Sequence, residues 1–351
     1  MATRTQALLT IWFFILFPCF PALAQPAGPN FVASALDSAP SPSLSSTPFA
    51  APQPTSGPLA ASPPTSTREE ALVYLQTAKL PDSSTFWPNV KLHLFIQNLK
   101  ANITTPLAIY QGSNTNFCGY AAISYLPLQN DPLTYTRFMV ALYTNGSATW
   151  GKIPFTPSPE VQMAAGTLHF KGILDIRHAD QMWFLILADH FRGYLNFLWP
   201  RFKPGAEDTF WAAVNFSKLN RMIRQLSGYH VEARGSDLFG PRFKDLYGYL
   251  TECLKTGVTY LYVNNTYLHK KNHAKGKFKN SFPTHFIVLT AIHRIPDEPD
   301  RQDMSRVNDD MVDIVYWDYG GRTLRQVSLR FLKKIIFGVT HCTPPSSSNS
   351  N

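Results

Sequence analysis

The pattern of apolar and polar positions divides the chain into two parts that predict different elements. From Glu69 onwards the pattern is first helical, with apolar residues about every three to four positions. Helices are predicted to start at Glu69 and to cover 132–146, 159–166, 179–197, 207–226 and 243–255. Short runs rich in Val, Ile, Tyr and Thr predict strands at 258–263, 285–292, 312–317 and 323–329.

Helices come first and strands second, and this order bears on the fold class. Strands that follow one another with few helices between them form a mostly antiparallel sheet. The sequence therefore predicts an α+β fold in which a helical lobe precedes a sheet lobe. Hydrophobic residues make up 44% of the 351 residues and charged residues 16%, which excludes a wholly disordered chain and a many-span membrane protein.

Residues 1–24 have the order of a secretory signal peptide. Arg4 supplies a positive charge, a mostly apolar run follows from Ala7 to Phe20, and the small residues Ala22 and Ala24 precede Gln25. A membrane anchor is the other interpretation, but the run is shorter than the roughly 20 residues of a spanning helix. We expect cleavage near Ala24 and a secreted or periplasmic protein.

Residues 25–67 have a composition that does not favour a folded core. Between Gln25 and Thr67 there are ten prolines and one charged residue, Asp37. Such a composition cannot bury enough apolar surface to offset the entropy of ordering the chain. We expect a disordered linker over 25–68, a folded domain over 69–342 and a disordered tail over 343–351.

Five lysines between Lys270 and Lys279 supply much of the formal net charge of +9. This cluster is either a solvated loop or a site for an anionic surface. Specific binding of nucleic acid is not expected, because only Phe278 offers a stacking ring. His269 and His273 are four residues apart, but no Glu follows the first and no third ligand is evident, so neither a metal nor another cofactor is expected.

Cysteine usage provides the first chemical signal. After the leader is removed, Cys118, Cys253 and Cys342 remain, and an odd number in an exported chain leaves at least one free thiol. Cys118 follows a polar loop and opens a small-residue segment, CGYAA, where a helix N-terminus favours the thiolate form of a cysteine. Cys253 lies within a predicted helix and Cys342 in the tail, and these two could pair. The alternative for Cys118 is a small buried residue at the start of a core helix.

A nucleophilic thiol needs a base, and the base needs a residue that orients it. His285 begins a strand, and Asp318 ends the next one just before a Gly-Gly turn. In a hairpin the start of one strand lies beside the end of the other, so the two side chains can meet. Asp313 is the competing carboxylate, but it lies early in its strand. Asp318 could also be an ordinary turn former.

The segments NFCGYAA, HFIVL and VYWDYGG, with a Gln upstream of the Cys, resemble the papain-like cysteine peptidases, and most closely bacterial branches such as the double-glycine leader peptidases. The resemblance implies a papain-like two-lobe fold, with the Cys in the helical lobe and the His and Asp on the sheet. It implies Cys118 as nucleophile, His285 as general base and then acid, and Asp318 as the residue that holds the imidazole tautomer.

The resemblance also implies an oxyanion hole made by a Gln side chain and the Cys118 backbone N–H. Gln111 lies seven residues before Cys118 rather than the usual six, so Asn114 or Asn116 could supply the second donor instead. Gly119 and Trp317, which adjoin the nucleophile and the carboxylate, are the expected substrate contacts.

These observations predict an exported cysteine peptidase or other amide-bond hydrolase that acts on a protein or peptide through a thioester. Two alternatives stay open. The chain could be an inactive papain-like binding protein that docks through its lysine cluster, or an acyl-transferring or deamidating effector with the same triad.

Overall fold

The computed structural model describes residues 65–197, 199–268, 282–295 and 310–345. All of them belong to one compact unit that spans Thr55–Asn351. The predicted leader, the lysine cluster with its two histidines, and nearly all of the predicted linker and tail lie outside the described residues. Within the described residues, no helix combines the length and the apolar character needed to cross a bilayer.

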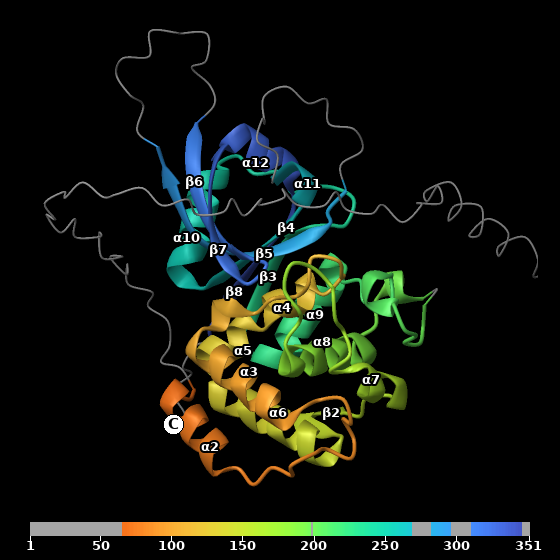
Figure 1. Cartoon of the computed structure of the whole chain (residues 1–351). Coiled ribbons are helices and arrows are strands. Elements are labelled where there is room, and N and C mark those ends of the chain that lie inside the picture. Colours follow the sequence, from red (N-terminus) through yellow and green to blue (C-terminus); the bar gives the residue numbers. More distant parts are fainter. Residues whose placement is uncertain (1–64, 198, 269–281, 296–309, 346–351) are drawn as a thin grey trace, which may run out of the picture. The chain divides into compact units, whose positions relative to one another are not determined.

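Helices dominate the first part of the described chain, below the sheet in Figure 1. They are α2 (Arg68–Thr77), α3 (Leu92–Thr104), α4 (Cys118–Ile123), α5 (Tyr125–Asn130), α6 (Pro132–Asn145), α7 (Pro159–Ala164), α8 (His178–His190) and α9 (Phe216–Ser227). Three short 3-10 helices, η1 (Pro106–Ala108), η2 (Tyr194–Asn196) and η3 (Ala206–Asp208), and a hairpin of β1 (Ala148–Trp150) and β2 (Ile153–Phe155) connect them.

The second part forms a six-stranded antiparallel sheet in the order β3-β8-β4-β5-β6-β7. Its strands are β3 (His230–Gly235), β4 (Val258–Val263), β5 (His285–Arg294), β6 (Met311–Asp318), β7 (Gly321–Ser328) and β8 (Ile336–Thr343). The helices α10 (Leu246–Thr256), α11 (Asn265–Leu268) and α12 (Leu329–Ile335) intervene. The predicted α+β class with an antiparallel sheet is therefore confirmed.

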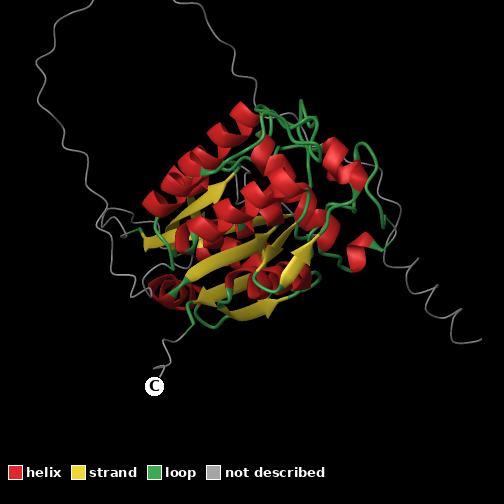
Figure 2. Ribbon diagram, turned by 90° about the horizontal axis from the view of Figure 1, so that it is seen from below, coloured by secondary structure: helices red, strands yellow, loops and turns green. Residues whose placement is uncertain are grey.

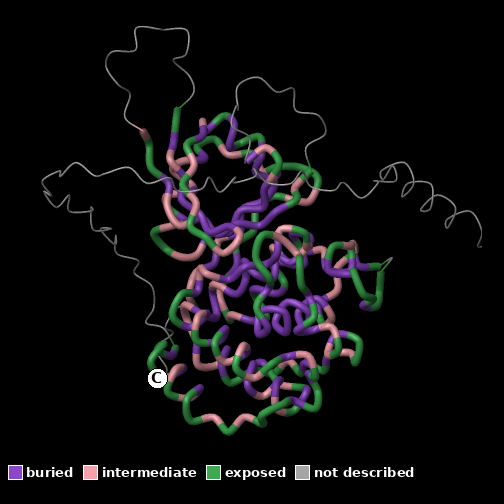
Figure 3. The backbone as a smooth tube through the Cα atoms, in the orientation of Figure 1, coloured by how far each residue is buried: buried purple, intermediate pink, exposed green. Residues whose placement is uncertain are grey.

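Two hydrophobic clusters cover the two faces of this sheet. Alternate strand residues such as Tyr262 and Phe286 join the large core of the helical part, whereas Leu261 and Ile287 pack with α10 and α12. This alternation follows from the two-residue period of a strand. Figure 2 shows helices over the strands, and Figure 3 shows that burial is concentrated in the strands and the central helices.

Local signals account for several elements. At the start of α6 the Asp131 side chain accepts a hydrogen bond from the Thr134 N–H, Pro132 occupies the first turn, and Gly146 ends the helix with φ 71°. The cap, the proline in the first turn and the glycine at the end are typical of helix boundaries, and the helix predicted over 132–146 agrees with α6. The predicted strand at 258–263 also agrees with β4.

The predicted helix over 207–226 is wrong in its first half. Only the short η3 forms there, and α9 begins at Phe216. The reason is that side chains capture the carbonyl groups a helix would use: Asn196 Nδ2 donates to the Phe210, Trp211 and Ala213 carbonyls, and Asn116 Nδ2 donates to that of Thr209. The predicted helix over 179–197 similarly ends early, at His190.

The position predicted for Cys342 also needs correction. It lies in β8, buried opposite Val258 of the neighbouring strand, and not in a tail. Cys253 lies in α10 as predicted, but neither residue is paired, because Cys118, Cys253 and Cys342 are all free thiols.

Candidate active site

Cys118 is the first residue of α4, and its side chain is partly exposed. Its neighbours Phe117 and Tyr120 are fully buried and fix the start of the helix in the core. As the first helical residue, Cys118 has a backbone N–H without an acceptor inside the helix. Gly119 allows a close approach to Val214, because a Cβ there would lie 2.8 Å from the valine side chain. The structure therefore places Gly119, the predicted substrate contact, against the protein core.

His285 and Asp318 lie at the start of β5 and the end of β6. The antiparallel register, with Val288 opposite Trp317, brings these two strand ends together. His285 Nε2 lies 2.5 Å from Asp318 Oδ1, and both side chains are buried. Asp313, the competing carboxylate, lies opposite His293 farther along the sheet. The geometry thus pairs His285 with Asp318.

The environment of His285 favours its protonated form. Burial alone lowers the pKa of the imidazole, but the Asp318 charge, the hydrogen bond that the imidazole donates to Asp318 and an interaction with the Cys118 side chain raise it, and the net pKa is well above the ordinary value. Nε2 is engaged by Asp318, so Nδ1 is the ring nitrogen left for the Cys118 thiol. The helix that Cys118 opens packs against the strand that His285 opens, so the thiol and the His285–Asp318 pair belong to one site.

Tyr319 also contacts His285. Its ring stacks on the His285 imidazole with centroids 5.0 Å apart and planes 18° from parallel. Tyr319 has a positive φ of 47°, and its hydroxyl accepts a hydrogen bond of 3.0 Å from Asn265 Nδ2. Neither residue was identified from the sequence. The position of Tyr319 directly after Asp318 could have indicated it, whereas no sequence pattern indicates Asn265.

Gln111 and Asn116, the two predicted oxyanion donors, have different surroundings. Gln111 is 1% exposed, and neither amide atom has a hydrogen-bond partner among the described residues. A buried primary amide without partners is costly, which makes it a candidate for binding a substrate oxygen. In contrast, Asn116 Nδ2 donates to the Thr209 carbonyl at 2.9 Å. The backbone N–H of Asn114, the third alternative, donates to the Lys171 carbonyl.

Trp317 is 2% exposed and belongs to the large hydrophobic cluster, where its indole N–H has no partner among the described residues. The structure places this predicted substrate contact in the core beside Asp318.

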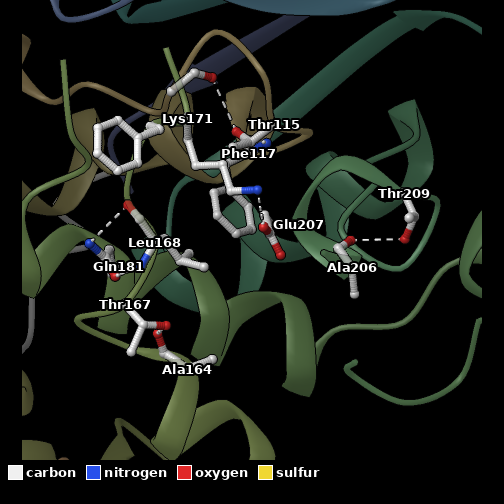
Figure 4. A network of polar contacts seen from close by, with 12 residues as sticks. Thr115, Phe117, Ala164, Thr167, Leu168, Lys171, Gln181, Ala206, Glu207 and Thr209 are labelled. Carbon is white, nitrogen blue, oxygen red and sulfur yellow. Dashed lines mark hydrogen bonds and ion pairs between the residues drawn. The ribbon is translucent and has the colours of Figure 1, made fainter. Parts of the chain in front are cut away.

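The loop that leads to Cys118 is held by two segments distant in sequence. The Lys171 carbonyl accepts the Asn114 N–H at 3.0 Å, and the Glu207 carbonyl accepts the Asn116 N–H at 2.8 Å. Lys171 Nζ also lies 2.6 Å from Glu207 Oε1, so an ion pair joins the two holding segments, as Figure 4 shows. The Glu207 side chain is 2% exposed, and its Oε2 has no partner within the described part of the chain.

Comparison with known proteins identifies no relative of this chain. No family model, no curated protein and no solved structure matches the chain. Among the residues that the structure describes, no group of three or more His, Cys, Asp or Glu could hold a metal ion.

Proposed function

We propose that this protein is a cysteine hydrolase that cleaves amide bonds in proteins or peptides, and that it is related in mechanism and two-lobe architecture to the papain-like cysteine peptidases. One observation carries the proposal: a buried His285–Asp318 pair on a strand that packs against the helix opened by a partly exposed thiol, Cys118. The leader-like sequence of residues 1–24 supports action outside the cytoplasm.

Acylation would begin from an ion pair of a Cys118 thiolate and protonated His285, in which the thiol proton already resides on Nδ1. The sulfur attacks the substrate carbonyl carbon, and the oxyanion is bound by the Gln111 amide and the Cys118 backbone N–H. Asp318 stabilises the imidazolium. His285 then donates its proton to the leaving amine as the C–N bond breaks, and a thioester remains.

Deacylation repeats these roles with water. His285 takes a proton from water as the oxygen attacks the thioester carbon. The C–S bond breaks, a carboxylic acid product leaves, and the Cys118 thiolate is regenerated beside protonated His285. Asp318 fixes which ring nitrogen carries the proton in both halves, because its hydrogen bond holds Nε2.

Iodoacetamide labelling near neutral pH, with mass spectrometry to locate the label, tests the triad. We expect preferential labelling of Cys118 over the buried Cys253 and Cys342, and slower labelling in His285→Ala. The matched control is His293→Ala, an exposed histidine on the same strand. Equal labelling rates in wild type, His285→Ala and His293→Ala would contradict the triad.

Digestion of a peptide library separates the possible reactions. We expect wild type to release new amino termini and Cys118→Ala to release none. Cys118-dependent consumption of peptides without cleavage would instead indicate acyl transfer or deamidation. No difference between wild type and Cys118→Ala would favour an inactive binding protein.

A further inference from the structure

Two residues other than glycine have positive φ among those described, and both are aromatic: Tyr319 at 47° and Phe170 at 58°. The left-handed region is unfavourable for bulky residues, and such residues concentrate at functional sites. Tyr319 stacks on His285. Phe170 has no comparable packing, because it is 89% exposed and its one ring contact in the described chain is with the adjacent His169.

Specific contacts hold the turn around Phe170 in place. Asp175 Oδ1 accepts the Phe170 N–H at 2.8 Å, and Asp175 Oδ2 lies 3.2 Å from His169 Nδ1. At Gly172 a Cβ would lie 2.1 Å from the Tyr110 hydroxyl, so only glycine permits this approach. The turn is therefore built against the residue that precedes Gln111.

The same turn is tied to the loop that ends at Cys118. The Lys171 carbonyl accepts the Asn114 N–H. The Lys171 ammonium group pairs with Glu207, as Figure 4 shows. Glu207 in turn receives the Asn116 N–H. A displacement of the turn would thus be transmitted to the loop of the candidate site.

This fixed turn presents large apolar side chains to solvent. Ile173 is 91% exposed and Leu174 62%, in addition to Phe170. Exposed apolar side chains that form a contiguous group mark interaction sites. Three more aromatic residues are exposed near Glu207, which also holds the loop before Cys118: Phe197, Trp199 and Phe210. The centroids of the Trp199 and Phe210 rings lie 5.2 Å apart.

We propose that the turn of Phe170, Ile173 and Leu174 binds large apolar side chains of the polypeptide cleaved at Cys118. This inference rests on the proposed function and adds the substrate class. The charges on the turn balance, because Lys171 is paired with Glu207 and the exposed Arg177 offsets the exposed Asp175. An apolar turn without excess positive charge favours a polypeptide over an anionic lipid surface. Substrate binding then explains why a bulky residue with a strained backbone is exposed at this position.

The test uses the full chain with Phe170→Asn and Ile173→Ser, each assayed on peptides that differ only in one side chain near the cleaved bond. Asn adopts positive φ readily, so Phe170→Asn removes the ring without straining the turn. We expect kcat/KM to fall about tenfold for peptides with Phe or Leu, and less than about twofold for the Ala peptide. The melting temperature should stay the same or rise. Matched controls are Leu324→Ser and Val73→Ser, exposed apolar residues on β7 and α2.

Peptide binding measured by fluorescence anisotropy in a Cys118→Ala background separates this inference from the proposed function. Loss of binding to the apolar peptides in Phe170→Asn supports the binding surface even if wild type shows no turnover. Cys118-dependent turnover with unchanged side-chain preference in both variants overturns the inference and leaves the hydrolase standing. A change confined to vesicle binding, tested with phosphatidylcholine and phosphatidylglycerol, or to self-association would also overturn it.

Discussion

The Tyr319 ring stacks on the His285 imidazole at a tilt of 18°, with centroids 5.0 Å apart, and it does so from a backbone conformation that bulky residues avoid. The strain costs about 1–2 kcal/mol. A ring pair contributes about 0.5–1.5 kcal/mol beyond burial, so the two terms nearly offset one another in stability. What the tyrosine adds is a fixed imidazole plane, held through its hydroxyl by Asn265.

Tyr319→Asn should therefore lower activity without destabilising the fold. We expect the melting temperature to stay within a few degrees of wild type, because Asn tolerates positive φ. The rate of peptide cleavage should fall about tenfold, since the imidazole is no longer held in one plane. Tyr319→Phe keeps the ring and is the matched control that isolates the Asn265 hydrogen bond. A large loss of stability with unchanged cleavage would assign Tyr319 a purely structural role.

Much of the candidate site could be predicted because its signals are local. Cys118 opens a helix, His285 opens a strand and Asp318 precedes a Gly-Gly turn, and each of these is visible within a few residues. The meeting of His285 and Asp318 follows from antiparallel pairing of consecutive strands, whereas Cys118 comes from a helix distant in sequence. The α+β class could be predicted for the same reason, since it depends on the order of elements.

The parts that could not be predicted depend on contacts between distant segments. Nothing near Lys171 in sequence indicates that it pairs with Glu207. The helix expected over 207–226 fails because Asn196 and Asn116 capture carbonyl groups from outside the segment. The strand β8 was missed because Gly338 interrupts a short apolar run, and pairing with β3 and β4 on both sides stabilises it.

Asp318→Asn should change how the protein responds to pH. In wild type the folded-state pKa of His285 is raised, so the His285–Asp318 pair contributes stability fully below the unfolded pKa of about 6.5 and loses it as pH rises through the folded value. Without the carboxylate, burial lowers the pKa of His285 and this contribution disappears. Urea unfolding should show a larger loss of stability in Asp318→Asn at pH 6 than at pH 9. A loss that is equal at both pH values would contradict a charged pair.

Gln111→Ala should separate catalysis from stability. The Gln111 amide is buried without partners, so its removal should leave the free energy of unfolding unchanged or slightly higher. Loss of one oxyanion donor typically lowers kcat about 10²–10³-fold, and KM should change little. Gln181→Ala is the matched control, because Gln181 is buried and its Oε1 accepts two backbone N–H groups. That variant should destabilise the fold. If Gln111→Ala destabilises equally and keeps kcat, the oxyanion role is wrong.

Lys171→Met should destabilise the protein by about 2–3 kcal/mol, because it leaves the Glu207 carboxylate buried and unpaired. Chemical denaturation of Lys171→Met, Glu207→Gln and the double variant gives the coupling energy between the two residues. We expect the double variant to recover part of the loss. Lys203→Met, an exposed lysine, is the control. Additive effects of the two single changes would mean that the ion pair does not hold the loop.

Asp180 should make stability depend on pH well away from the candidate site. It lies fully buried in α8 and accepts hydrogen bonds from Asn98 Nδ2 at 3.2 Å and Asn102 Nδ2 at 2.7 Å, yet burial raises the pKa of its carboxyl to about 6 from 3.8. Because the folded-state pKa is the higher one, the folded state binds more protons between these values. The stability contributed by the neutral carboxyl is full below pH 3.8 and is lost as pH rises through 6.

The size of this effect follows from the difference of about two pKa units, which corresponds to roughly 3 kcal/mol. Asp180→Asn should flatten the dependence of unfolding free energy on pH between 4 and 7, whereas Asp208→Asn, at an exposed position, should not. Urea titrations of both variants at several pH values in this range measure the effect. If the wild-type slope persists in Asp180→Asn, the proton uptake belongs to another group, because that variant no longer carries the Asp180 carboxyl.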